Sequence, residues 1–169
     1  MKRNWVNIMT REEAYYGLIK LYCGDFEFYD EWLNIFLESE DPLSNIVLEL
    51  IDCKSIKDAE YALRLYCLEK PFDVKGVYTR LRLELSQKYE SGKLVISDVM
   101  SWIYRIAKSI PDCFFRNCAY TLSDYYCLVE DGIISAHRFE AFLRKWLKNG
   151  GRVVDEEIWG MENPINKVE

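Results

Sequence analysis

The sequence predicts an all-α fold, a single-domain irregular helical bundle or a short stack of helical hairpins, with about eight helices. Three observations predict it. Apolar residues recur three and four residues apart along most of the 169-residue chain. Capping side chains and helix-ending Gly or Pro residues separate these segments. The strict apolar–polar alternation of a half-buried strand is scarce.

Start and stop residues bound the predicted helices. The first helix is expected over 11–22 and the second over 27–37. Pro42 is expected at the first position of the third helix, where its missing N–H costs nothing. Seven starts carry a capping side chain: Thr10, Asp41, Ser55, Asp73, Ser97 or Asp98, Asp112 and Ser135. The predicted stops are Gly24, Pro71, Gly92, Pro111, Gly132 and Gly150–Gly151.

One short sequence pattern occurs twice. Residues 90–97 and 130–135 each combine a Gly stop, a short apolar run and a Ser, and their glycines are 40 residues apart. This spacing fits stacked helical hairpins, as in helical-repeat proteins. An irregular bundle explains it equally well.

The domain prediction divides the chain at its last glycine pair. Residues 1–151 are expected to form one helical domain, and residues 152–169 an acidic C-terminal tail. Ile158 and Trp159 are too apolar for a free tail, so we expect the tail to dock partly, through Trp159.

Composition argues against several classes of protein. The six cysteines form no Cys-x-x-Cys pair, and no export signal or membrane-length apolar run is present, so we expect reduced thiols, no membrane partner and a cytoplasmic location. With a single histidine, His137, the sequence predicts neither a metal site nor a cofactor. Basic and acidic residues are too mixed over 54–151 for direct nucleic-acid binding.

No catalytic residues are predicted, and we do not expect an enzyme. Asp131 and Gly132 resemble the centre of an EF-hand loop, but Cys127, Val129 and Arg138 then occupy ligand positions. His137 lacks the partners of a Cys–His or Ser–His–Asp site. The 28 acids are too numerous for sequence to select a catalytic pair.

The feature that stands out is an acidic block over residues 21–53. It contains nine Asp and Glu residues and no Lys, Arg or His, although the whole chain carries a net charge of only −6. Phe and Tyr residues and Trp32 lie between the acids. Dense like charge costs stability through self-repulsion, which a function that uses the field would justify. The alternative is an ordinary solvated face.

An acidic and aromatic surface suits a basic protein partner, because acids accelerate encounter and aromatic rings serve as anchors. Trp32 or Tyr29 would be the anchor if its ring is not already in the core. The predicted partner-binding residues are Asp25, Glu27, Tyr29, Asp30, Glu31, Trp32, Glu38, Glu40 and Asp41.

The runs 41–50, 99–105 and 122–126 with 131–135 resemble those of small, acidic, all-α immunity proteins of bacterial polymorphic-toxin systems, including contact-dependent growth inhibition. The resemblance spans about residues 10–150. It implies an inhibitor of one cognate toxin, often a basic nuclease domain, and transfers no individual functional residue. A helical-repeat adaptor or scaffold and an enzyme with an unrecognised site remain alternatives, and the sequence leaves the oligomeric state open.

Overall fold

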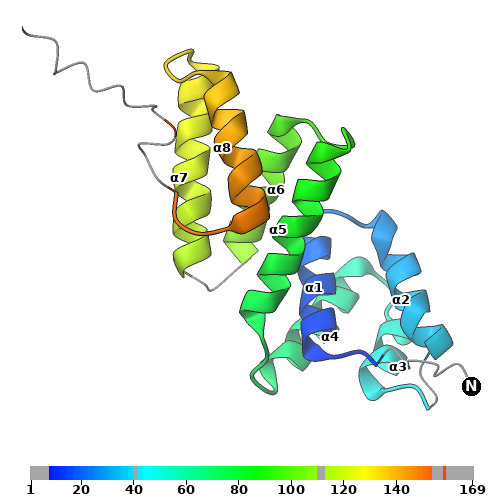
Figure 1. Ribbon diagram of the computed structural model, residues 1–169. Helices are drawn as coiled ribbons and strands as arrows, with labels where there is room; N and C mark the ends of the chain where they lie inside the picture. The colour runs from blue at the N-terminus through cyan, green and yellow to red at the C-terminus, as the bar shows by residue number, and fades with distance from the viewer. Residues whose placement is uncertain (1–7, 40–41, 110–112, 154–157, 159–169) are drawn as a thin grey trace, which may run out of the picture. The chain divides into compact units, whose positions relative to one another are not determined.

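The computed structural model describes residues 8–39, 42–109, 113–153 and 158. Across these residues the chain is helical and contains no strand, which confirms the all-α prediction (Figure 1). The helices of this described part are α1 (Arg11–Tyr22), α2 (Glu27–Ser39), α3 (Asn45–Asp52), α4 (Ile56–Leu68), α5 (Val74–Glu90), α6 (Ile96–Ser109), α7 (Cys113–Glu130) and α8 (Ala136–Asn149).

The helices group into two compact units, residues 1–78 and 79–169. We call them unit 1 and unit 2. The boundary falls inside the continuous helix α5, two residues after Gly76. The sequence predicted one helical domain over 1–151, because a single glycine within a helical pattern does not by itself mark a boundary between units.

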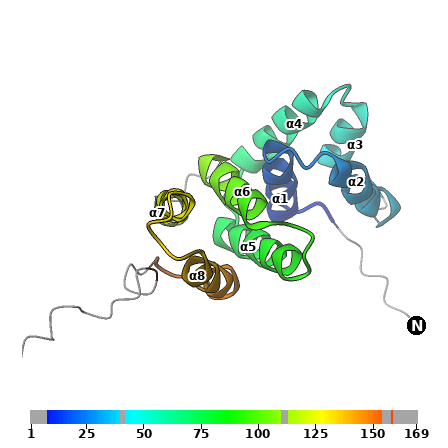
Figure 2. The ribbon, with the colours of Figure 1, turned by 90° about the horizontal axis from the view of Figure 1, so that it is seen from above.

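Unit 1 is built around the pair α1 and α4, which lie side by side in Figure 1 and Figure 2. Helix α3 packs against α4, and α2 packs against both α1 and α3. The buried apolar residues recur at helical spacing on each element, as the pattern predicted. In α1 and α4 they include Ala14, Leu18, Ile19, Ala59, Ala62 and Leu63.

Three predicted caps are confirmed in unit 1. The Thr10 hydroxyl accepts a hydrogen bond from the Glu13 N–H at 3.2 Å, and Ser55 accepts one from Asp58 at 3.2 Å. Before α5, a carboxylate oxygen of Asp73 accepts a hydrogen bond from the N–H of residue 76 at 2.9 Å. Each bond satisfies a backbone donor that the first helical turn leaves free.

The predicted start of the third helix was wrong. Helix α3 begins at Asn45, so Pro42 lies in a bend before the helix and not at its first position. Asp41 lies outside the described residues. The preference of proline for the first helical turn depends only on nearby residues. The chain must also turn after α2 so that α3 can pack against it. The bend uses the residues that the sequence assigned to the helix.

Unit 2 contains two helical hairpins with the same turn. Gly92 and Gly132 have left-handed backbones, with φ of 72° and 71°. After Gly92, the Lys93 N–H bonds to the Lys88 carbonyl at 2.9 Å, and the Ile133 N–H bonds equivalently to Leu128 at 2.9 Å. Both turns are Schellman motifs, which satisfy the last carbonyls of a helix. The sequence pattern that occurs twice therefore forms the same turn at two places, 40 residues apart.

The end of α8 is held by a side chain from α5. The guanidinium of Arg82 donates to the Trp146 carbonyl at 3.2 Å and also to the Leu147 carbonyl. Burial lowers the pKa of Arg82. The Trp146 carbonyl also accepts from the Gly150 N–H at 2.7 Å, so the guanidinium is a second donor there and caps the end of α8 from a neighbouring helix. Ile158 is fully buried, whereas Trp159, through which the tail is predicted to dock, lies outside the described residues.

Candidate functional site

The acidic block folds mainly into α2, which is strongly amphipathic. Tyr29, Trp32, Leu33 and Phe36 are buried, at the spacing of one helix face. The opposite face is solvent-exposed and carries Glu27, Asp30, Glu31, Asn34, Ile35 and Glu38. Four of the predicted partner-binding acids are thus brought together on one face of one helix.

Two predicted partner-binding residues lie in the core. Trp32 is 4% exposed and Tyr29 is 8% exposed. Trp32 packs against Phe36 with ring centroids 5.4 Å apart, and against Tyr29 at 5.9 Å. Neither ring can therefore serve as a surface anchor in this arrangement. Of the aromatic residues of α2, Tyr29, Trp32 and Phe36 are buried and Phe28 is half-buried, so no ring within this helix accompanies the exposed acids.

Asp25 is also engaged within unit 1. Its carboxylate lies 2.6 Å from the ammonium of Lys20, a residue that is only 2% exposed. The ammonium also lies 5.0 Å from the centre of the Phe28 ring. The acidic block contains no base, but Lys20 precedes it by one residue and neutralises its first acid. Asp25 therefore belongs to a structural ion pair.

Further acids of the block lie on α3. Glu49 and Asp52 are exposed, and α3 packs against α2. Glu40 and Asp41, which the sequence also predicted as partner-binding, lie outside the described residues. We define the acidic α2–α3 surface by six exposed acids, Glu27, Asp30, Glu31, Glu38, Glu49 and Asp52, and by the exposed apolar residues Phe26, Ile35, Leu48 and Ile51.

The apolar members of this surface were not predicted. Phe26 is 52% exposed, and Ile35, Leu48 and Ile51 are each 46–47% exposed. Leu48 and Ile51 lie three residues apart on α3, so they share a face. On a helical wheel Ile51 lies only about 40° from the buried Val47, so the pattern alone does not separate the two, and the packing of α3 decides that Ile51 is exposed.

The negative charge of the acids contributes to the pKa shifts of neighbouring groups. Burial raises the pKa of the Cys53 thiol, and the negative charges of Asp58, Glu49 and Asp52 raise it further. Burial also raises the pKa of Tyr29 to about 12, with smaller effects of Cys53 and Asp30. A negative potential disfavours each additional anion. The surface is thus suited to cations.

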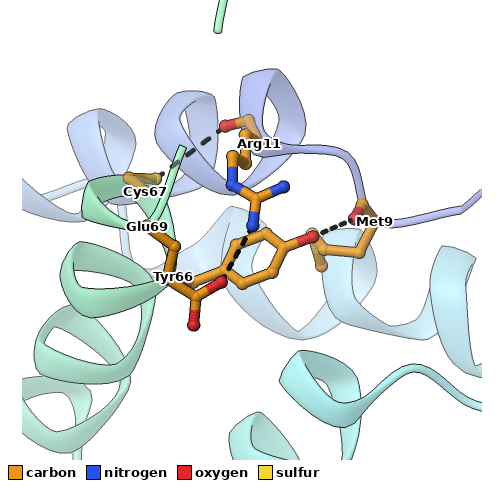
Figure 3. Close-up of polar contacts among 5 residues, drawn as sticks. All are labelled: Met9, Arg11, Tyr66, Cys67 and Glu69. Atoms are coloured by element: carbon orange, nitrogen blue, oxygen red, sulfur yellow. Dashed lines mark hydrogen bonds and ion pairs between the residues drawn. The ribbon is translucent and has the colours of Figure 1, made fainter. Parts of the chain in front are cut away.

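A second polar cluster ties the start of α1 to the end of α4 (Figure 3). The Arg11 guanidinium lies 4.6 Å from the centre of the Tyr66 ring and donates to Glu69 at 2.8 Å. Tyr66 donates to the Met9 carbonyl at 3.1 Å, and the Cys67 thiol lies 3.8 Å from the Arg11 carbonyl. Burial raises the pKa of Cys67 to about 12, which keeps it a thiol.

The described residues offer no group of three or more His, Cys, Asp or Glu side chains that could hold a metal ion. His137 is exposed in the first turn of α8. Within the same residues no helix is both long and apolar enough to cross a membrane.

Comparison with known proteins finds no matching family model, no similar curated protein and no similar solved structure.

Proposed function

We propose that this chain is a non-enzymatic inhibitor that binds a basic protein through the acidic α2–α3 surface. The proposed partner is a cognate bacterial toxin domain, in particular a nuclease, and the proposed place of action is the cytoplasm. The exposed acids would attract the cationic face that a nuclease presents to phosphates. Ile35, Leu48 and Ile51 would supply the apolar contacts, in place of the buried Tyr29 and Trp32.

The observation that carries this proposal is the position of three acids along their helices. Glu38 lies in the last turn of α2, and Glu49 and Asp52 lie in the last turn of α3. The partial negative charge of a helix C-terminus disfavours acids there, by about 0.3–1 kcal/mol each at an exposed site. Neither of these last turns contains a basic residue. Helix stability therefore does not explain these acids, whereas recognition of a cation does.

The apolar residues support a protein partner over a small cation. Acids alone would suffice to attract ions. Large apolar side chains left nearly half exposed among the acids gain free energy only when another apolar surface covers them. Acids for encounter and aliphatic groups for the contact itself are the combination expected of a protein interface.

The test is affinity capture from a lysate of the native cells at low salt, followed by identification and purification of the captured protein. The key variant is Asp30→Lys with Glu31→Lys. The matched control is Asp124→Lys with Asp131→Lys, two exposed acids of unit 2. We expect one basic protein, lost only with the first pair, whose toxicity to cells is relieved by co-expression of this chain.

The kinetics of the purified pair provide the decisive readout. The association rate should fall steeply as ionic strength rises, because steering is screened over about 8 Å at physiological salt. A rate that does not depend on salt, or a complex equally weakened by both variant pairs, would contradict binding through the acidic α2–α3 surface.

A second candidate function is that of a helical-repeat adaptor. The repeated Schellman turns at Gly92 and Gly132 favour it, because stacked hairpins with a fixed period are the basis of helical-repeat scaffolds. An adaptor would capture several partners, and their binding would survive the Asp30→Lys and Glu31→Lys changes. Capture of one basic partner that is lost with these changes favours the inhibitor.

A further inference from the structure

The outer face of α4 carries an apolar stripe that the described residues of unit 1 leave exposed. Tyr61, Leu65 and Leu68 lie at positions i, i+4 and i+7 of this helix, so they line one face. Their side chains are 63%, 45% and 72% exposed, and Leu68 and Tyr61 are the two most exposed large hydrophobic residues of the described chain. The inward face of the same helix holds Ala59, Ala62 and Leu63, so the stripe is additional to the core.

Charges of opposite sign border the stripe. At 100° per residue, Lys57 and Arg64 fall on one flank, and Asp58 and Glu69 on the other. Arg64 and Glu69 are both exposed and are five residues apart. Arg11 binds one oxygen of Glu69, Oε2, and the Glu69 side chain is still 61% exposed, so it can accept a second cation.

We infer that α4 pairs with α4 of a second copy of this chain, with the two helices parallel. In a parallel pair related by a two-fold axis along the helices, each flank meets the opposite flank of the partner helix. Arg64 of one copy then faces Glu69 of the other, at the five-residue offset of ion pairs across a parallel coiled coil. An antiparallel pair brings each flank against its own equivalent, so like charges meet.

The apolar contacts are consistent with this pairing. With Tyr61 and Leu68 as two d positions and Leu65 as the intervening a position, the stripe follows the coiled-coil pattern, and Arg64 and Glu69 become its g and e positions. The stripe covers only about two helical turns, so we expect a weak, reversible dimer with a Kd in the micromolar range. The inference does not depend on the proposed toxin partner, because the acidic α2–α3 surface lies on other helices.

Sedimentation velocity of the full chain under reducing conditions tests the dimer. We expect a monomer–dimer equilibrium, with a Kd raised about 100-fold or more by Leu65→Ser with Leu68→Ser. The matched control is Val95→Ser with Ile133→Ser in unit 2, whose side chains are 60% and 59% exposed. A chain that stays monomeric up to about 1 mM, or a dimer that survives the α4 changes, would overturn the inference.

Charge reversal tests the pairing itself. Arg64→Glu should raise the Kd about 3- to 10-fold, because it turns two exposed ion pairs into repulsions. Glu69→Arg should do the same, and the double reversal should restore the dimer. A double variant that dimerises no better than either single variant would show that these residues do not face each other.

Cross-linking tests the orientation. Parallel pairing brings the two copies of residue 61 together, so Tyr61→Cys should form a disulfide-linked dimer readily in an oxidising buffer. Val95→Cys, at a site of similar exposure in unit 2, controls for random collision and for the native thiols. Equal rates for the two variants would reject parallel pairing of α4.

Discussion

The indole of Trp32 on α2 lies against the backbone of Gly17 on α1. A Cβ atom added at Gly17 would stand 2.6 Å from both Cη2 and Cζ2 of the indole, closer than real Cβ contacts allow. The absence of a side chain at Gly17 is therefore what lets α2 bury its tryptophan against α1. The same contact keeps Trp32 out of the acidic α2–α3 surface.

The Gly17→Ala change should destabilise unit 1. In a helix without this contact, Gly→Ala raises stability by about 1 kcal/mol. Here the added methyl group overpacks the core, and we expect a net loss of roughly 1–3 kcal/mol in the free energy of unfolding. Urea unfolding measures it. In a Trp32→Leu background the same change should cost much less, and equal costs in both backgrounds would contradict the contact.

Replacement of Asp25 should lower the stability of the fold, because it removes the carboxylate partner of a buried ammonium group. Asp25→Asn leaves the ammonium of Lys20, which is 2% exposed, without its carboxylate. We expect a loss of about 2–4 kcal/mol, because an unpaired buried charge is strongly unfavourable. Asp30→Asn, on the exposed face of α2, should change stability by less than about 0.5 kcal/mol. Thermal or urea unfolding of both variants provides the comparison, and similar losses would argue against a structural ion pair.

Two tyrosines should respond differently to loss of their hydroxyl groups. The Tyr29 hydroxyl is buried and has no hydrogen-bond partner among the described residues, whereas the Tyr15 hydroxyl lies 3.1 Å from that of Tyr78. Tyr29→Phe should leave stability unchanged or raise it, because it removes an unsatisfied buried group. Tyr15→Phe should cost about 1 kcal/mol. Denaturant unfolding decides between them, and a larger loss at Tyr29 would indicate a partner for its hydroxyl.

Glu12 should make part of the stability depend on pH. The Asp73 N–H donates to its carboxylate at 3.0 Å, and this bond is the largest of the effects that lower the pKa of Glu12 below its ordinary value of 4.5. A carboxylate whose pKa is lower in the folded state stabilises the fold above the unfolded value, and this stabilisation disappears as pH falls through the folded value.

The Glu12→Gln variant should therefore be less stable than the unmodified chain near neutral pH. The difference should persist down to about pH 4.5 and then shrink as the carboxylate of the unmodified chain is protonated. Unfolding free energies measured across this range test the expectation. A difference that stays constant to the lowest pH at which both chains fold would refute the role of the Glu12 charge.

The sequence predicted most local features because their causes are local. The cap at Thr10 and the Schellman turns at Gly92 and Gly132 depend on residues within one or two turns, so spacing is sufficient to find them. The start of α3 was wrong because the bend before it depends on how α3 packs against α2. The division inside α5 was also not predicted, since a continuous helix contributes to both units.

For the candidate site, the sequence by itself determined the concentration of negative charge. Net charge over 33 residues is a sum and requires no fold. Only the tertiary structure decided which residues present that charge. It placed Tyr29 and Trp32 in the core, paired Asp25 with Lys20, and left Ile35 and the α3 residues Leu48 and Ile51 at the surface. The physical reason is that exposure depends on which helix covers which face, and this is fixed by contacts such as that between Trp32 and Gly17.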